Sequence, residues 1–272
     1  MKVIPLLIAL STLFATERFE SGPLVGYSDL PKHQVFSIAI LLQGAQRESA
    51  RGLHEALKGE ILPLHMGVVT LEKGKETEPL QRIEDHLLLF SQLKKLFPGW
   101  NGKLALIGQG EGGRVAAALA AKQNDLLALI LISAGGGWNP RDELLISFKN
   151  EMAASGFSPQ YIHSFLVQAR AQFENATLKP SSKHDCFGFS YKYWDALMKS
   201  DLIGDLSKLN CPIYYMHGDL DDRIPIESVN FLVKAMKEKP NLTVHRYPKA
   251  GREIIQDPDT YHKALAWLQR VI

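Results

Sequence analysis

The stretch from Leu104 to Ala121, LALIGQGEGGRVAAALAA, constrains the fold of this chain more than any other. A short apolar run, Leu104–Ile107, is followed by a cluster of four glycines and then by an alanine-rich segment that is typical of a helix. The pattern predicts a strand, a sharp turn and a helix in direct succession. Because glycine has no Cβ, the cluster also allows the strand and the helix to pass close together at the turn.

The spacing of these glycines matches a nucleophile elbow. In that turn, G-x-S-x-G, the central residue is held at positive φ and small residues stand two positions to either side of it. Residues 108–112 read GQGEG, so the glycine frame is present and Gly110 stands where the serine would be. We expect Gly108, Gly112 and Gly113 to provide the space that the turn needs.

A phosphate-binding glycine loop is the alternative interpretation of the same turn. Gly108, Gly110 and Gly113 meet the spacing G-x-G-x-x-G of a dinucleotide site at the start of a helix. Such a site also has an acidic ribose ligand about 20 residues further on. Here Asp125 precedes the next apolar run instead of ending one. The elbow is therefore favoured over the dinucleotide loop.

Length and charge place the chain among globular α/β proteins. Its 272 residues are enough for one domain of this class with a full core. The 31 basic and 29 acidic side chains give a formal net charge of +2, which argues against a nucleic-acid partner. Cys186 and Cys211 are too few for a disulfide scaffold or a cysteine metal site. We expect no metal, no other cofactor and no bridge between the two cysteines.

The N-terminal segment indicates export. Lys2 is followed by an apolar run, Val3–Ala15, and then by polar residues. A positive start and a short apolar core are features of a secretory signal peptide, although Leu13 is large where a small residue is preferred and a buried first strand is also apolar. Residues 1–15 are therefore predicted to be a signal peptide of a secreted or periplasmic protein; otherwise the chain is cytoplasmic. The run is too short to span a bilayer, and no transmembrane span is expected in the mature chain.

Apolar runs alternate with helical patterns along most of the chain. Val35–Leu42, VFSIAILL, is nearly continuous, as in a strand buried on both faces of a parallel sheet. The other expected strands are 65–71, 104–107, 126–133, a run from 211 to 218, and 242–247; the expected helices are 48–57, 78–97, the segment after residue 110, 226–237 and 260–271. The alternation predicts an α/β fold with a doubly wound, mostly parallel sheet, whose ligands bind at the carboxyl ends of the strands.

The alternation stops at about residues 139–200. This segment shows helical patterns and no convincing strand. Aromatic residues recur in these patterns, among them Trp138, Phe148, Tyr161, Phe165, Phe173, Phe187, Phe189, Tyr191 and Trp194. We expect a helical cap inserted over the edge of the sheet, with most of these aromatics in a core. The prediction is one domain, residues 16–272, that includes this cap.

Taken together, four stretches resemble the α/β-hydrolase family, and within it the secreted serine esterases whose elbow reads G-H-S-E-G-G. The resemblance runs from about Val35 to the C-terminus. The stretches are LLQG at 41–44, similar to the oxyanion loop; residues 106–117, similar to the elbow; HGDLDDRIP at 217–225, similar to the turn of the catalytic acid; and YPKAGR at 247–252, where the family has its catalytic histidine. Each is weak alone, and their order makes the combination fairly specific.

The resemblance assigns the triad positions to Gly110, Arg252 and Asp221. In a working triad a serine attacks a carbonyl, a histidine takes and returns its proton, and an aspartate orients the imidazole. Glycine carries no nucleophile, and arginine, with a pKa above ~12, does not accept a proton near neutral pH. Asp221 alone keeps its role, and we expect it to pair with Arg252. His217, at the end of a strand, is expected to be a packed or surface histidine and not a displaced base.

The same resemblance implies further contacts near the elbow. Gln43, Gly44 and Ala45, together with Gln109 and Glu111, are the candidates for the oxyanion loop and for ligand binding. Glu111 is also a candidate replacement for the nucleophile or base, because carboxylates act in this way elsewhere. The family carries a glutamate here beside an active serine, which favours a structural role for Glu111.

These observations favour a pseudoenzyme that keeps the cleft, has lost serine hydrolysis and binds a small acyl or ester-like ligand or a protein partner. Two alternatives remain open: an active carboxylic-ester hydrolase with a non-standard constellation, and a structural or interaction protein whose cap docks a partner. A retained pocket favours ligand binding, and a pocket filled by side chains favours the interaction role. A carboxylate within reach of a histidine favours catalysis.

Overall fold

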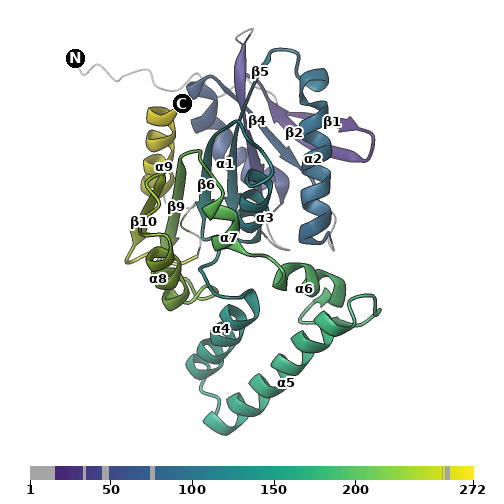
Figure 1. Cartoon of the computed structure of the whole chain (residues 1–272), viewed down its shortest axis with the longest axis vertical. Coiled ribbons are helices and arrows are strands. Elements are labelled where there is room, and N and C mark those ends of the chain that lie inside the picture. Colours follow the sequence, from purple (N-terminus) through teal and green to yellow (C-terminus); the bar gives the residue numbers. More distant parts are fainter. Residues whose placement is uncertain (1–15, 33–34, 45–48, 74–76, 253, 255–257) are drawn as a thin grey trace, which may run out of the picture.

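A computed structural model describes residues 16–32, 35–44, 49–73, 77–252, 254 and 258–272. Its centre is an eight-stranded sheet in the spatial order β1 (Glu17–Ser21), β2 (Leu24–Asp29), β4 (Met66–Leu71), β3 (Phe36–Leu42), β5 (Trp100–Gln109), β6 (Leu126–Ile132), β9 (Ile213–Gly218) and β10 (Leu242–Tyr247). The strands from β4 to β10 pair in parallel, and the β1–β2 hairpin joins β4 in antiparallel pairing. The predicted mostly parallel sheet is confirmed (Figure 1).

Helices cover both faces of this sheet, because successive side chains on a strand point to opposite faces. On β3, Ile38 and Ile40 pack in one apolar layer with α2 (Pro79–Leu96), α3 (Glu111–Ala120), α7 (Leu202–Ser207) and α8 (Ile226–Ala235). Ala39 and Leu41 pack in the other layer with α1 (Ala50–Ile61), the short 3-10 turn η1 (Leu62–Leu64) and α9 (Pro258–Val271). The doubly wound arrangement predicted from the buried strands is therefore confirmed.

The expected elements outside the cap are present, with shifts at their ends. Strand β10 covers the predicted residues 242–247, whereas β5 already begins at Trp100. The prediction missed the first residues of β5 because they are partly exposed and form no apolar run. The β1–β2 hairpin is not predicted by the sequence analysis. Its outer strand, Glu17–Ser21, lies exposed at the edge of the sheet and therefore lacks the apolar run that marks a buried strand.

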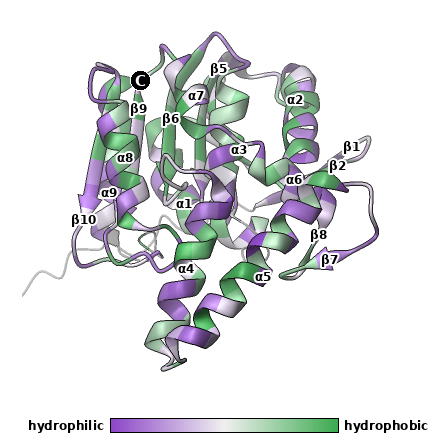
Figure 2. Ribbon diagram, turned by 60° about the horizontal axis from the view of Figure 1, so that its bottom comes forward, coloured by the Kyte–Doolittle hydropathy of each residue, from purple (hydrophilic) through white to green (hydrophobic). Residues whose placement is uncertain are grey.

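We call residues 139–200, which lie between β6 and β9 in the chain, the cap. Its helices are α4 (Pro140–Ala154), α5 (Pro159–Leu178) and α6 (Tyr191–Met198). Of these, α4 and α5 extend away from the sheet and carry both hydrophilic and hydrophobic segments (Figure 2). The cap has an apolar core of its own, in which Phe173, Tyr193 and Trp194 are buried. A hairpin of β7 (Asp185–Cys186) and β8 (Phe189–Ser190) corrects the expectation that the cap holds no strand. Strands of two residues are too short to show an alternating pattern.

Local sequence signals start the cap helices. Asn139, Ser158 and Ser190 each precede a helix and accept a hydrogen bond from a backbone N–H group of its first turn. Pro140 and Pro159 stand at the first helical position, where the missing N–H group costs nothing. These caps fix where α4, α5 and α6 begin.

Two predictions fall outside the described residues: the signal peptide at 1–15 and the ligand contact at Ala45. Within the described ranges, no helix combines the length and the apolar character that a membrane crossing requires. Cys186 and Cys211 are both free thiols.

Candidate functional site

The turn between β5 and α3 has the backbone of a nucleophile elbow. Gly110 stands at its apex with φ 55° and ψ −125°, directly before the first residue of α3. This conformation costs a residue with a side chain on the order of 1–3 kcal/mol, whereas glycine adopts it without that strain. The positive φ predicted for Gly110 is confirmed.

The neighbouring glycines allow the strand and the helix to approach each other. A Cβ added to Gly112 would lie 2.2 Å from the carbonyl oxygen of Leu42, and one added to Gly113 would lie 2.3 Å from the Cβ of Ala134. The Cβ position of Gly108 is 2.5 Å from the carbonyl oxygen of Gly112. Atoms this close would overlap, so these three positions require glycine, as the sequence analysis expects.

Arg252 lies beside the apex of the elbow. A Cβ built on Gly110 would be 3.3 Å from the guanidinium Nη2 of Arg252 and 3.7 Å from the Cα of Gly44. The loop that carries Arg252 is held at the end of β9, where the Leu220 N–H donates to the Ala250 carbonyl at 2.9 Å. The fold thus brings together two positions, 110 and 252, that are far apart in the sequence.

The Asp221 carboxylate stabilises its own turn. Its Oδ1 accepts hydrogen bonds from the N–H groups of Arg223 at 2.8 Å and Ile224 at 3.0 Å. Its Oδ2 is buried and has no partner among the described residues. Among the residues that the structure describes, no ion pair joins Asp221 to Arg252, so the prediction of this pair is wrong. The guanidinium lies at Gly110, and the backbone of the turn uses one oxygen of the acid.

A cleft of about 1570 Å³ opens between the cap and the carboxyl end of the sheet. Gly110, Glu111, Ser133 and Arg252 line it on the side of the sheet. The cap contributes a mostly apolar wall: Pro140, Leu144, Phe148, Phe187, Phe189, Tyr193, Trp194 and Leu197. The loops after β9 and β10 contribute further residues, among them Asp222, Arg223 and Lys249. The cleft is at least as large as typical small-molecule sites, about 300–1,000 Å³, so side chains do not fill it.

No protein-family profile matches this chain, and no curated protein matches its sequence. Solved structures do match. Esterase Pf2001 of Pyrococcus furiosus aligns with a TM-score of 0.64 and 15% identity over 95% of this chain and 91% of that chain. Est1E from Butyrivibrio proteoclasticus (TM-score 0.63, 15% identity, 94% and 96% of the chains) and a carboxyl esterase from Bacillus coagulans (0.63, 17%, 94% and 97%) are similar to the same extent. This chain has the α/β-hydrolase fold.

In this α/β-hydrolase fold, Glu111 follows the elbow apex and both its carboxylate oxygens are engaged. Oε1 forms an ion pair with Arg82 of α2 at 2.6 Å, and both side chains are buried. Oε2 accepts a hydrogen bond from the phenol of Tyr193 in the cap. Burial, followed by the charge of Glu111, raises the pKa of Tyr193, so the phenol stays protonated and donates. Glu111 therefore joins the elbow to α2 and to the cap.

The predicted oxyanion loop is held by the same arginine. Arg82 Nη2 donates to the carbonyl of Gln43 at 2.6 Å, and Gln43 Nε2 donates to the carbonyl of Leu71 at 3.2 Å. Lys73 donates to the carbonyl of Gly44. The Gln43 side chain is therefore committed to the end of β4.

The structure gathers only part of the predicted site around the cleft. Among the described residues, Gly110, Glu111 and Arg252 line it. Gln43, Gly44, Gln109 and Asp221 are not part of this lining. The resemblance therefore identifies the elbow and the position facing it, whereas it does not identify the residues of the cap wall.

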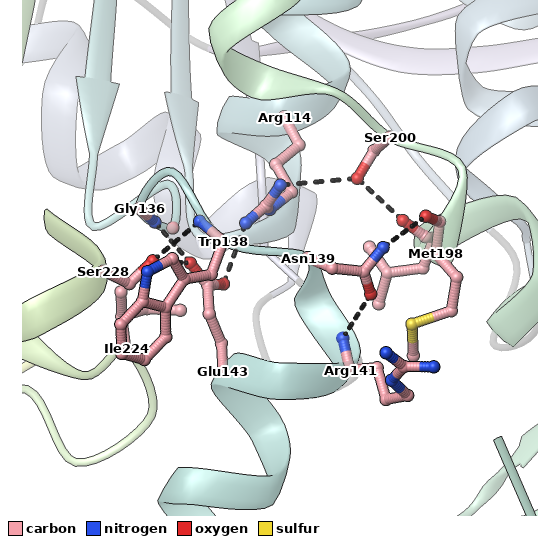
Figure 3. A network of polar contacts seen from close by, with 12 residues as sticks. Arg114, Gly136, Trp138, Asn139, Arg141, Glu143, Met198, Ser200, Ile224 and Ser228 are labelled. Carbon is pink, nitrogen blue, oxygen red and sulfur yellow. Dashed lines mark hydrogen bonds and ion pairs between the residues drawn. The ribbon is translucent and has the colours of Figure 1, made fainter. Parts of the chain in front are cut away.

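A second buried ion pair, which the sequence analysis misses, joins α3 to the base of the cap (Figure 3). Arg114 Nη2 lies 2.8 Å from Glu143 Oε2 of α4. The other oxygen of Glu143 accepts hydrogen bonds from the Gly136 N–H and the Ser228 hydroxyl, each at 2.7 Å. Arg114 also donates to Ser200 at 3.4 Å. The only signal in the sequence is a charged residue within an alanine-rich helix, which does not identify the partner.

His217 is buried at the end of β9, and neither ring nitrogen has a partner among the described residues. Burial lowers its pKa, although the charges of Asp221 and Asp219 act in the opposite direction. A fully buried imidazole that does not line the cleft cannot exchange a proton with a ligand there. Of the two roles expected for it, packed or surface, His217 is a packed histidine.

A buried aspartate, histidine and threonine form a further polar cluster away from the cleft. His54 Nε2 lies 2.8 Å from Asp29 Oδ2, and Nδ1 lies 2.9 Å from Thr70 Oγ1. All three side chains are buried, and burial lowers the pKa of His54. None of the three is among the described residues that line the cleft. The cluster joins α1 to β2 and β4.

One residue of the cap wall has an unusual backbone. Phe187 has φ 50° and Gly188 has φ 81°, and these two residues form the turn between β7 and β8. A bulky residue at positive φ is rare and costs on the order of 1–3 kcal/mol. The Phe187 ring contacts Phe148 and Phe173 at centroid distances of 5.2 Å and 5.0 Å. A strained turn therefore holds an aromatic ring at the cleft.

Proposed function

We propose that this chain binds a small acyl or ester-like ligand in the cleft and does not hydrolyse it. One observation carries the proposal: the apex of the elbow is Gly110, and the side chain beside it is Arg252. Glycine offers no nucleophile, and a guanidinium accepts no proton near neutral pH. The open cleft, lined by aromatic and charged side chains, supports the binding role.

The two other functions have less support. Catalysis through Glu111 requires a free carboxylate, and both of its oxygens are engaged by Arg82 and Tyr193. A purely structural protein does not need an open cleft, and side chains do not fill the cavity of about 1570 Å³.

Ester hydrolysis by the purified wild-type chain tests the proposal. On p-nitrophenyl acetate and butyrate we expect the rate of the protein-free control. Turnover that co-purifies with the folded chain would contradict the proposal. If that turnover disappears in Glu111→Gln while the circular dichroism spectrum is unchanged, catalysis uses the carboxylate beside the apex.

A pair of double variants examines the geometry. We expect Gly110→Ser with Arg252→His to gain turnover, because the nucleophile and the base then face each other beside the turn of Asp221. Gly110→Ala with Arg252→His is the matched control, since it restores a side chain at the apex without a hydroxyl. Labelling of residue 110 by a fluorophosphonate in the serine variant alone would show that the elbow still presents a nucleophile.

A further inference from the structure

We infer that the ligand of the cleft is an apolar carboxylate, bound with its carboxylate at Arg252 and its tail against the aromatic wall of the cap. The inference rests on the proposed function, because it names the chemical class that the cleft binds. Three observations carry it: the charges of the lining, the position of Arg252 and the apolar character of the cap wall.

The charges of the lining leave an excess of cations. Among the charged residues there, Glu111 pairs with Arg82, and Arg114 pairs with Glu143, so these carboxylates are already neutralised. The remaining charged residues of the described lining are the cations Arg223, Lys249 and Arg252 and the anion Asp222, none of which forms an ion pair with a described residue. A cleft with this balance favours an anionic ligand.

Arg252 is the cation at the elbow. It is half-buried, whereas Arg223 and Lys249 are exposed, so its charge is the least hydrated of the three. Its Nη2 lies 3.3 Å from the Cβ position of Gly110, at the N-terminus of α3, where the helix dipole also favours negative charge. A guanidinium donates two parallel hydrogen bonds to a carboxylate. A carboxylate here would therefore be held by Arg252 and would occupy space that Gly110 leaves free of a side chain.

The wall of the cap suits an apolar tail. Phe148, Phe187, Phe189 and Trp194 line the cleft, together with Leu144 and Leu197. Phe189 packs 5.4 Å from Trp194 and Phe187 packs 5.2 Å from Phe148, measured between ring centroids. These residues lie on the cap, while the cations lie on loops at the edge of the sheet, so the lining separates a polar region from an apolar one. An amphipathic carboxylate matches both regions, and a fully polar anion matches only one.

Calorimetric titration with ligands that differ only in their head group tests the inference. The probes are phenylbutyrate, its methyl ester, phenylbutanol and phenylbutylamine, each added to the full chain at neutral pH. We expect phenylbutyrate to bind at least about tenfold more tightly than the ester or the alcohol, since a hydrogen bond to a charged group contributes that much. The amine should bind most weakly.

Three variants locate the two ends of the ligand. Arg252→Gln should weaken phenylbutyrate about tenfold and leave the alcohol unchanged, because only the carboxylate uses the guanidinium. Arg246→Gln is the matched control, since Arg246 pairs with Asp219 away from the cleft lining, and it should change neither affinity. Phe187→Leu should weaken the acid and the alcohol alike, because both carry the same tail.

Each outcome decides between the two proposals. Equal affinity for acid and alcohol, or an acid preference that survives in Arg252→Gln, overturns this inference. Binding of the ester without binding of the acid also overturns it and leaves the proposed function standing. Failure of all four probes to bind at millimolar concentration contradicts both, and turnover of the methyl ester by the wild-type chain contradicts the proposed function alone.

Discussion

Two groups of charges meet at the cleft, and they differ in how they are satisfied. The side chains of Glu111 and Glu143 are buried and paired with Arg82 and Arg114. The Glu143 pair joins the cap to α3, and Glu111 reaches the cap through the phenol of Tyr193. Arg252 faces the same cleft without an ion pair among the described residues. This difference indicates that the paired charges of Glu111 and Glu143 position the cap, while the unpaired charge of Arg252 is available to a ligand. Their removal should therefore have opposite consequences for stability and for binding.

The largest effect is expected from breaking a buried pair. Glu143→Ala should lower the free energy of unfolding by about 3–5 kcal/mol, because it leaves the charge of Arg114 buried without its ion-pair partner. Urea denaturation followed by circular dichroism measures the loss. The neighbouring Asp142→Ala is the control, since its carboxylate is exposed and should contribute about 0–1 kcal/mol. A cost below about 1 kcal/mol for Glu143→Ala would remove the distinction between the two groups of charges.

Acid should lower the free energy of unfolding through His86, which contacts the backbone of Arg82 in the first buried pair. Burial lowers the pKa of His86 from 6.5 to about 4, and its Nδ1 donates to the Arg82 carbonyl at 2.6 Å. Because the folded pKa lies below the unfolded value, the unfolded chain binds the proton first. Stability is therefore full above pH 6.5 and is lost as the pH falls towards about 4. A shift of this size corresponds to about 3 kcal/mol.

Thermal unfolding between neutral pH and pH near 4 measures this loss. His86→Gln removes the titrating group and keeps a donor for the Arg82 carbonyl, so its unfolding temperature should fall less over the same range. A wild-type profile no steeper than that of the variant would show that His86 does not contribute to the acid sensitivity.

The smallest effect on stability is expected at the unpaired charge. Arg252→Gln should change the free energy of unfolding by less than about 0.5 kcal/mol, because a half-buried side chain without an ion pair is lost. Arg82→Gln, measured under the same denaturing conditions, is the contrasting variant and should cost several kcal/mol. Similar losses in the two variants would show that Arg252 also has a structural role.

Much of the fold could be predicted because its central strands are buried on both faces. Apolar runs such as Val35–Leu42 indicate the position and length of a strand without knowledge of its partners. The β1–β2 hairpin could not be found in this way, since one of its strands is exposed. The turn at Phe187 could not be found either, because the hairpin it closes has strands of two residues and a bulky residue at positive φ.

The site was predictable where the backbone itself requires a residue type. Gly108, Gly112 and Gly113 signal the elbow because a Cβ does not fit at any of them. The partner of a charged side chain leaves no such local signal. Arg82 and Glu111 are distant in sequence, and the expected partner of Asp221 proved wrong. Pairing of charges depends on tertiary packing, which the spacing of residues does not record.

The glycine at the elbow apex has a consequence for how this protein can evolve. A serine placed alone at position 110 brings backbone strain and lies against Nη2 of Arg252. A histidine placed alone at position 252 finds no hydroxyl at the elbow apex, because residue 110 is glycine. Neither single substitution creates a nucleophile together with a base. An evolutionary path to this combination therefore passes through a single variant that gains no hydrolytic activity. The two positions are therefore epistatic, and the present pair is a state that one-step evolution does not easily leave.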